Sequence, residues 1–373
     1  MSRLDELIAE LCPNGVEYKR LEDCCSILDN KRKPVTKAAR VAGDYPYYGA
    51  NGIQDYVADY IFDGTFILVG EDGSVITQSG NPVVTWAEGK IWVNNHAHIA
   101  AGKDGMLLRF LFHYIQTVDI KDLIHGNIPK LTGGDFRAIE IPFPPLSVQQ
   151  EIVRILDSFT ELTAELTAEL TARKNQYTFY RSSLFEFKDK VQTVYLEDIS
   201  ENCDSQRRPV TKEDRVSGIY PYYGASGIVD YVEDYIFDGD YLLISEDGAN
   251  LLARVTPIAF SITGKNWVNN HAHILKFKDW HDQRYVEIYL NGIDLSKYIS
   301  GATQPKLNQK NLNSIPIPYP PREERVRMVE ILDKYERLCC SISDGLPAEI
   351  AARQRQYEYY RDKLLTFQEL KVE

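Results

Sequence analysis

The sequence lacks the features of a membrane protein, a secreted protein or a disulfide-bonded protein. It contains no uninterrupted apolar run near the roughly 20 residues of a membrane span. Its first segment, MSRLDELIAELC, carries acidic residues inside an apolar pattern, unlike a signal peptide. Its six cysteines do not recur between the two halves of the chain, which argues against a disulfide framework and against a duplicated metal site. We therefore expect a cytoplasmic protein with reduced thiols and no membrane partner.

Sequence signatures of catalysis are also missing. Neither a G-x-x-x-x-G-K-[ST] phosphate loop nor the NPP[YF] pocket of adenine methyltransferases occurs. A partial D…E-x-K nuclease pattern joins Asp72 to Glu88 and Lys90, but Thr263 replaces the carboxylate at the matching place in the second half. We therefore expect a non-catalytic chain with no metal and no directly bound cofactor, so that any chemistry belongs to partner proteins.

Positive charge is scarce overall but locally concentrated. The formal net charge of −12 argues against a stand-alone nucleic-acid binder, because phosphate neutralisation supplies most non-specific affinity. Two loops are nevertheless basic. KRKPVTKAAR, from Lys31 to Arg40, holds five basic and no acidic residues, and QRRPVTKEDR, from Gln206 to Arg215, holds four basic and two acidic residues. Such loops could bind DNA locally while other faces bind proteins.

The dominant feature that is present is a duplication. The octet WVNNHAHI, from Trp92 to Ile99, returns unchanged from Trp267 to Ile274. A shift of 175 positions also aligns YPYYGA, DYIFDG and EDG with second copies, and 32 of 55 positions between Tyr45 and Ile99 are identical. Both copies are dense in Gly, Tyr, Asn and Asp, with short β-rich pieces between turn signals. The sequence therefore predicts two similar mixed domains.

A long helical pattern follows each domain. It begins after the proline-rich segments IPFPPLSVQQ, from Ile141 to Gln150, and IPYPPREERV, from Ile317 to Val326. Apolar residues then recur every three, four or seven positions, which predicts one apolar face along each helix. The second pattern is interrupted at DGLPAEI, where Gly345 can end one helix and Pro347 can begin the next. The patterns finish alike, with QYTFYRSSL and QYEYYRDKL.

These patterns predict an α+β fold. Two duplicated mixed α/β globular domains are separated by two long helices, which pack as an antiparallel coiled coil with pseudo-twofold symmetry. The expected parts are residues 1–145 for the first domain with an N-terminal arm, 146–188 for the central helix, 189–321 for the second domain, and 322–373 for the C-terminal helix with a break near 344–347.

This order of domain, long helix, domain, long helix resembles the specificity (S) subunit of Type I restriction-modification systems. The motifs GNIPKL, GATQPKL and GLPAEIAARQRQ are similar to those of such subunits, and the resemblance covers essentially the whole chain. It implies that each domain is a target recognition domain that reads one half of a bipartite, near-palindromic site in double-stranded DNA. It also implies that the helices set the spacer between the half-sites and dock two modification (M) subunits. S-adenosylmethionine would then be bound by the M subunits, with ATP and Mg on partner subunits that include the restriction (R) subunits.

Three groups of recurring residues are candidate DNA contacts. Basic side chains beside the PVTK turn suit phosphate oxygens, with a solvated loop as the alternative. Polar residues of the Gly-bounded hairpin loop suit phosphates or base edges, with tyrosines in the core as the alternative. A lysine after a proline could anchor the DNA backbone or could simply be a surface lysine. The residues are Arg32, Lys33, Lys37, Tyr47, Tyr48, Asn51 and Lys130 in the first copy, and Arg207, Arg208, Lys212, Tyr222, Tyr223, Ser226 and Lys306 in the second.

The octet allows three interpretations. Its polar residues could form a base-reading edge, since Asn suits a bidentate contact with adenine. Its two histidines would share a face of a strand, as a metal pair does, but no acidic residue or cysteine lies at a convincing spacing. Its polar groups could instead satisfy buried backbone as a structural signature of the domain. The residues are Asn94, Asn95, His96, His98, Asn269, Asn270, His271 and His273.

The segments Ser74 to Glu88 and Ala249 to Thr263 share only one proline in register, although near-identical sequence flanks them. They could carry the reading that differs between half-sites, or they could be drifting surface loops. The candidate residues are Thr77, Gln78, Ser79, Asn81, Asn250 and Arg254. Two other functions stay open. One is a metal-dependent nuclease that uses Glu88 and His96, and the other is a coiled-coil adaptor that does not bind DNA.

Overall fold

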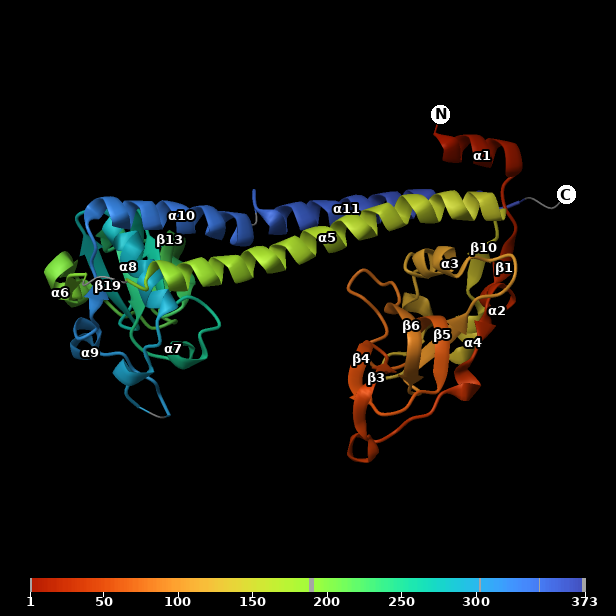
Figure 1. The fold of residues 1–373 in the computed structure, drawn as a ribbon, viewed down its shortest axis with the longest axis horizontal. Coiled ribbons are helices and arrows are strands. Elements are labelled where there is room, and N and C mark those ends of the chain that lie inside the picture. The colour runs from red at the N-terminus through yellow and green to blue at the C-terminus, as the bar shows by residue number, and fades with distance from the viewer. Residues whose placement is uncertain (1, 188–190, 302, 342, 371–373) are drawn as a thin grey trace. The chain divides into compact units, whose positions relative to one another are not determined.

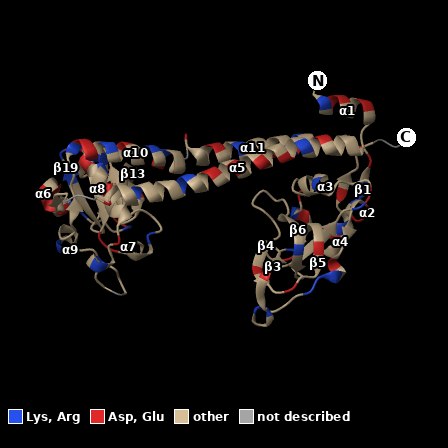
Figure 2. Ribbon diagram, viewed as in Figure 1, with Lys and Arg blue, Asp and Glu red and all other residues tan. Residues whose placement is uncertain are grey.

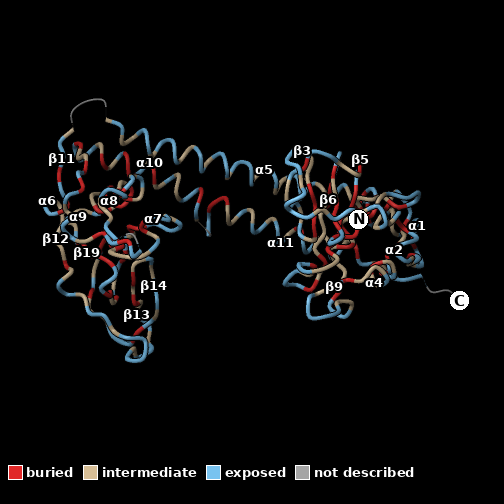
Figure 3. The backbone as a smooth tube through the Cα atoms, turned by 90° about the horizontal axis from the view of Figure 1, so that it is seen from below, coloured by how far each residue is buried: buried red, intermediate tan, exposed pale blue. Residues whose placement is uncertain are grey.

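The computed structural model describes residues 2–187, 191–301, 303–341 and 343–370. Their contacts divide the chain into two units. Unit 1 comprises Met1–Leu166 and Glu349–Glu373, and unit 2 comprises Thr167–Ala348. Each unit therefore contains one globular part together with segments of the long helices. Figure 3 shows buried residues gathered in the globular parts, while the long helices are mostly intermediate or exposed.

Unit 1 is built on a six-stranded sheet. Its order is β2(Ser26–Ile27), β7(Ala97–Ala101), β5(Phe62–Gly70), β6(Val84–Val93), β3(Ala42–Gly49), β4(Gly52–Val57). Only the pairing of β3 with β6 is parallel. The central strand β5 contains the apolar run FILV, whose side chains alternate between two cores: Ile67 and Val69 pack on one side, Phe66 and Leu68 on the other. A strand covered on both faces needs such a continuous apolar run.

Short elements complete unit 1 (Figure 1). The helix α3(Leu108–Ile115) packs its apolar side into the core that contains Ile67. The other elements are α1(Arg3–Leu11), β1(Tyr18–Arg20), α2(Leu21–Cys24), η1(Asp29–Lys31), η2(Lys37–Ala39), α3(Leu108–Ile115), η3(Lys121–Leu123), β8(Ile124–His125), β9(Lys130–Leu131), α4(Gly133–Ala138) and β10(Glu140–Pro142). The segment after α1 lies beside the C-terminal segment, because Val16 exchanges backbone hydrogen bonds with Gln368 and Leu370, both at 2.8 Å.

Unit 2 repeats this topology with shorter strands. Its two sheets follow the orders β12-β19-β16-β17 and β14-β13-β18-β15, which match β2-β7-β5-β6 and β4-β3-β6-β5 of unit 1. The strands are β12(Ser200–Asn202), β13(Ser217–Gly224), β14(Gly227–Val232), β15(Phe237–Asp238), β16(Tyr241–Ser245), β17(Ala259–Ile262), β18(Lys265–Val268) and β19(Ala272–Phe277). The remaining elements are β11(Thr193–Val194), α6(Leu196–Ile199), η4(Asp204–Gln206), α7(Asn250–Ala253), α8(Trp280–Gly292), η5(Ser296–Tyr298), α9(Gln309–Asn313) and β20(Ile317–Pro318). The predicted duplication of a mixed α/β domain is confirmed.

Long helices follow each globular part. The helix α5(Leu146–Leu184) has 39 residues, while α10(Arg322–Cys340) and α11(Leu346–Leu364) are separate. In unit 1, Phe159 of α5 stacks on Tyr360 of α11, with 5.4 Å between the ring centroids. In unit 2, Tyr180 of α5 packs on Tyr335 of α10 at 5.3 Å. Lys and Arg are interspersed with Asp and Glu along these helices (Figure 2). The predicted domain bounds and pseudo-twofold relation stay predictions.

The break in the second helical pattern has a local cause. A Cβ on Gly345 would lie 2.6 Å from the carbonyl oxygen of Arg337, so the chain needs glycine to leave α10 at this point.

Among the described residues, no helix is both long enough and apolar enough to cross a membrane.

Candidate nucleic-acid interface

The repeated motifs meet at one edge of each sheet. In unit 1 the turn after β3, the EDG turn after β5 and the NNH turn before β7 are joined by backbone hydrogen bonds. The N–H of Asn94 donates to Tyr48 O at 3.1 Å, and the N–H of Glu71 donates to His96 O at 2.9 Å. Unit 2 repeats both bonds at 3.0 and 2.8 Å. We call this region the loop edge, defined as residues 49–52, 71–73, 94–96 and 130 and their counterparts 224–227, 246–248, 269–271 and 306.

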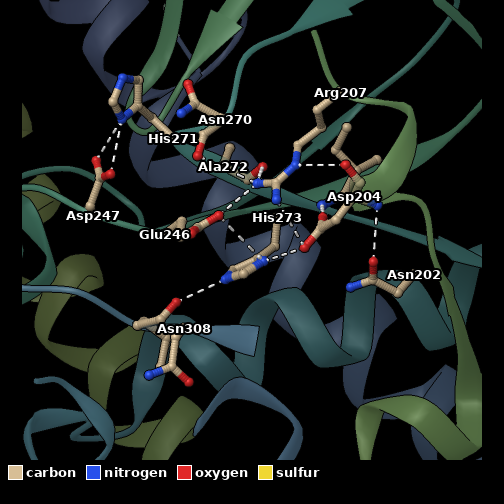
Figure 4. Close-up of polar contacts among 12 residues, drawn as sticks. Asn202, Asp204, Arg207, Glu246, Asp247, Asn270, His271, Ala272, His273 and Asn308 are labelled. Carbon is tan, nitrogen blue, oxygen red and sulfur yellow. Dashed lines mark hydrogen bonds and ion pairs between the residues drawn. The ribbon is translucent and has the colours of Figure 1, made fainter. Parts of the chain in front are cut away.

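A charged cluster lies beneath each loop edge. In unit 2, drawn in Figure 4, Nη1 of Arg207 donates to Glu246 at 2.6 Å, and Nδ1 of His273 lies 2.6 Å from Asp204. Lys306 pairs with the other oxygen of Glu246 at 3.1 Å. Unit 1 repeats these contacts with Asp29, Arg32, Glu71, His98 and Lys130. The cluster joins segments that are far apart in the sequence and so fixes the loop edge.

The ring of His273 has acceptors at both nitrogens. Nδ1 faces the carboxylate of Asp204, and Nε2 lies 2.8 Å from the carbonyl oxygen of Leu307. Each ring nitrogen therefore faces an oxygen atom. Burial alone would raise the pKa of Asp204, but the hydrogen bonds with His273 and with the backbone N–H of Ile274, together with the charge of Arg207, hold that pKa below its ordinary value. The pKa of Glu246 is lowered in the same way, against burial, by Arg207 and His273.

Metal binding does not fit this cluster well. One oxygen or nitrogen from each of Asp29, Glu71 and His98 lies within 4.8 Å of the others, as do those of the matching residues in unit 2. However, the guanidinium of Arg32 and the ammonium of Lys130 already pair with these carboxylates. A cation would have to displace them, so the cluster is better described as an internal ion-pair network.

This network corrects the roles predicted for two arginines. Arg32 and Arg207 were expected to contact phosphates, but their side chains are only 12% and 15% exposed. Their guanidinium groups donate to carboxylates and to the backbone oxygens of Ala97 and Ala272. His98 and His273 are likewise 1% exposed. We therefore assign these four residues to holding the loop edge.

The neighbouring basic side chains have the opposite environment. They are exposed and have no ion-pair partner within the part of the chain that the structure describes. The backbone of their loop is nevertheless anchored, because the indole N–H groups of Trp92 and Trp267 donate to Lys33 O and Arg208 O at 2.6 Å. These side chains are Lys33, Lys37, Arg208 and Lys212. They keep the position expected of phosphate contacts.

The first tyrosine of the repeated Tyr-Tyr pair in each hairpin supports the basic loop from inside. Tyr47 and Tyr222 are each 1% exposed. The hydroxyl of Tyr47 accepts from the N–H of Val35 at 3.0 Å, and Arg40 stacks on its ring at 4.1 Å. Unit 2 repeats this with Val210 and Arg215. Tyr48 is 7% exposed and Tyr223 half-buried, so the core alternative describes these tyrosines, whereas Asn51 and Ser226 are exposed in the turn.

The octet divides into inner and outer residues. Asn94 and Asn269 are 3% and 7% exposed, and their side-chain oxygens accept from the N–H groups of His96 and His271 at 2.8 Å. The outer residues are Asn95, His96, Asn270 and His271. His271 pairs with Asp247 at 2.9 Å, and His96 pairs with Asp72. Lys130 and Lys306 are half exposed beside them, bound to Glu71 and Glu246.

The divergent segments mostly bond internally. Thr77, Ser79 and Asn81 form a side-chain network, and together with Gln78 they line a cavity of about 690 Å³ beside Arg361 of α11. In unit 2 the carboxamide of Asn250 bonds both backbone groups of Thr256. Arg254 adopts a left-handed φ of 51° and donates to the carbonyl oxygens of Leu290 and Ile293 at the end of α8.

These bonds correct the expectation for Asn250 and Arg254, which hold a loop and a helix end rather than presenting free polar groups. Gln78 is exposed and has no hydrogen-bond partner among the residues described. The candidate nuclease residue Glu88 accepts from Trp86 at 2.7 Å. In the described chain no hydrogen bond or ion pair joins Glu88 to His96 or Asp72.

The charged cluster is not evident from the sequence, because its members in unit 1 are scattered from residue 29 to residue 130. The available signal was their joint recurrence. Asp29, Arg32, Glu71 and His98 reappear after 175 positions, and Lys130 reappears after 176.

A second duplicated contact fixes each globular part to its long helix. In unit 1, Arg109 of α3 donates to Asp157 of α5 at 2.8 Å, and in unit 2 Arg284 of α8 donates to Asp333 of α10 at 2.8 Å. In unit 1 His113 joins the pair, since its Nε2–H donates to Asp157 and its Nδ1 accepts from the hydroxyl of Tyr357. Burial lowers the pKa of His113 to about 4, so the ring is neutral near pH 7.

Comparison with known proteins identifies the family. The model of the Type I restriction modification DNA specificity domain matches residues 13–173 and again 188–352. The chain belongs to this family. It is 36% identical over 94% of its length to a Haemophilus influenzae protein assigned provisionally as a type I restriction enzyme specificity subunit, covering 96% of that protein. It is 33% identical over 70% of its length to the Escherichia coli EcoR124I/EcoR124II specificity subunit, covering 71% of it.

Solved structures show the same fold. The S subunit of a type I restriction-modification system from M. genitalium aligns with a TM-score of 0.61 at 16% identity, over 94% of this chain and 96% of that chain. A chain from a study of type I restriction-modification complex assembly aligns with a TM-score of 0.57 at 16% identity, over 95% and 98%. The predicted family is therefore confirmed, and these relatives support neither the nuclease nor the adaptor hypothesis.

Proposed function

We propose that this chain is the DNA-reading, non-catalytic subunit of a Type I restriction-modification complex. Each unit reads one half of a bipartite site in double-stranded DNA, and the long helices set the spacer and dock two M subunits. R subunits join the same complex. Methyl transfer from S-adenosylmethionine belongs to the M subunits, and ATP and Mg are used by partner subunits.

The observation that carries the proposal is the duplicated loop edge with its basic neighbours. Exposed lysine and arginine side chains flank exposed Asn and His side chains in both units, and the charged cluster holds both sets from beneath. Cations suit phosphate oxygens, while amides and imidazoles suit base edges. The residues proposed to face DNA are Lys33, Lys37, Asn51, Asn95, His96 and Lys130 in unit 1, and Arg208, Lys212, Ser226, Asn270, His271 and Lys306 in unit 2.

The repetition of these residues supports a near-palindromic target. Two similar surfaces recognise similar half-sites, and a pseudo-twofold arrangement would place those half-sites on opposite strands. The half-sites are then expected to differ where the residues that face them differ between the two units.

A binding experiment tests the proposal. The chain purified with its M partner should retard duplex DNA that contains its site, and the retardation should weaken steeply with salt, because phosphate contacts release counterions. The chain incubated alone with Mg should leave supercoiled DNA intact. Failure of the complex to bind any duplex, or metal-dependent nicking abolished by Glu88→Ala, would overturn it.

A further inference from the structure

The hairpins at the two loop edges are almost identical. β3 pairs with β4, and β13 with β14, in the same register and with the same two irregularities. Of the 13 residues from Tyr45 to Val57, 11 are identical to those from Tyr220 to Val232. The differences are Asn51 against Ser226 and Gln54 against Val229. Because the backbone frame is shared, these two differences alone distinguish the hairpins between Tyr45 and Val57.

Residue 54 lies at the point where the hairpin meets the octet. The side-chain oxygen of Gln54 accepts a hydrogen bond from Nδ2 of Asn94 at 3.2 Å, and Asn94 in turn holds the N–H of His96. The Gln54 amide crosses Gly49 closely, since a Cβ at Gly49 would overlap it. Gln54 therefore contacts the first residue of the NNH turn, whose next two residues, Asn95 and His96, are exposed, and Gln54 is itself exposed.

Val229 occupies the matching place in unit 2 with different chemistry. Its Cγ2 would lie 2.8 Å from a Cβ on Gly224, and its side chain is 58% exposed. It offers neither a donor nor an acceptor. Among the described residues Nδ2 of Asn269 therefore has no side-chain acceptor, whereas Asn94 has one.

In the described residues, the side-chain amide nitrogen of Gln54 is available to donate a hydrogen bond to a ligand. Its oxygen is occupied by Asn94, and its Nε2 has no acceptor within the part of the chain that the structure describes. A side chain held in this way presents N–H donors to a ligand. In the major groove, purines offer acceptors at N7 and, for guanine, at O6, while thymine offers a methyl group to apolar side chains.

We propose that Gln54 and Val229 are specificity-determining residues. Gln54 donates to the N7 or O6 edge of a purine in the half-site read by unit 1, and Val229 contacts the methyl group of a thymine at the matching position read by unit 2. This inference rests on the proposed function. It makes residue 54 and residue 229 the source of a difference between otherwise similar half-sites.

Exchange of these residues tests the inference. The whole chain is expressed with its M partner, and methylated adenines are mapped for the wild type, Gln54→Val, Val229→Gln and the double exchange. Each residue already occurs on this backbone in the other unit, so the exchanges preserve the fold. We expect Gln54→Val to change the preferred base at one position of one half-site from purine to thymine, by about 10- to 100-fold in relative methylation. Val229→Gln should make the reverse change in the other half-site.

Two further variants sharpen the test. Gln54→Glu keeps the shape and the bond to Asn94 but replaces donors with an acceptor, so it should shift the preference toward cytosine, whose amino group donates. Asp44→Ile is the matched control. It also replaces an exposed residue of unit 1 with its exposed counterpart in unit 2, Ile219, but near the other end of the hairpin. It should leave the recognised sequence unchanged.

The outcomes separate the inference from the proposed function. If the wild type yields no methylated bipartite site, the proposed function fails. If the wild type yields one and the exchanges leave every position unchanged, the assignment of residues 54 and 229 is wrong. Loss of the M partner on purification of Gln54→Val, with bases unchanged, would also overturn it by showing that the position contacts protein.

Discussion

Arg207 donates a hydrogen bond to Glu246 at 2.6 Å, although 39 residues separate them in the sequence. The next residue, Arg208, is exposed and has no ion-pair partner among the described residues. Adjacent arginines therefore have different roles. One holds the loop edge together from inside, and the other is available to a phosphate.

Arg207→Ala should destabilise unit 2. It leaves Glu246 and Asp204 with a missing partner in a mostly buried site, and removing one member of such a pair costs about 3 kcal/mol. Urea unfolding should show a lower midpoint. Arg208→Ala is the control and should change the free energy of unfolding by less than about 0.5 kcal/mol. Equal stability of the two variants would contradict the structural role of Arg207.

Lys33→Ala should weaken DNA binding without changing the sequence that is recognised. Loss of one phosphate contact reduces the slope of log affinity against log salt by about 1. Titration of the complex with labelled duplexes at several salt concentrations measures this slope. Lys121→Ala removes an exposed lysine that pairs with Asp119, and it should leave the slope unchanged. A change in the preferred bases for Lys33→Ala would assign that lysine to base reading.

Unit 1 should lose stability on acidification through His113. Burial lowers its folded pKa to about 4, below the ordinary 6.5, so between these pH values only the unfolded chain takes up the proton. The free energy of unfolding that the neutral ring contributes above pH 6.5 is therefore lost as the pH falls toward 4. The loss is about 3 kcal/mol, because each pKa unit corresponds to about 1.36 kcal/mol. Asp157, Arg109, Tyr357 and Arg361 are the charged and titratable groups that face the ring.

The measurement compares the wild type with His113→Gln, which keeps a donor for Asp157 but does not titrate. The difference in free energy of unfolding between the two proteins should shrink or reverse between pH 6.5 and pH 4. A difference that is constant with pH would show that His113 is not buried as a neutral ring.

The TAEL repeat predicts a change in spacer length. TAEL occurs at residues 163–166 and 167–170 inside α5, and an added unit should lengthen the helix by about 6 Å. At roughly 3.4 Å per base-pair step, the unread spacer should widen by one or two base pairs. Mapping of methylated sites for the wild type, an insertion and a deletion of one unit measures this. An unchanged spacer would refute the proposed role of the helix as a ruler.

The sequence predicted the architecture because its signals were local or periodic. The repeated octet gave two domains, the apolar periodicity after Pro145 and Pro321 gave long helices, and Gly345 marked a helix end. These features depend on neighbours within a few positions, which sequence patterns report directly.

The site was harder to predict because burial depends on distant segments. Arg32 and Lys33 are adjacent basic residues in the sequence, yet only Arg32 is largely buried, because it pairs with Glu71 and Asp29. Arg254 looked like a polar group for base reading, but carbonyl oxygens at the end of α8 bind it. Such distinctions arise from tertiary contacts that one sequence does not display.

We propose that two similar loop edges read two similar half-sites. Sequencing of methylated adenines in DNA from cells that express this chain with its M partner tests it most directly. We predict an interrupted, imperfect palindrome, with methylation in both half-sites and a mismatch where Gln54 and Val229 differ. Two unrelated half-sites, or no bipartite methylated sequence, would contradict this proposal.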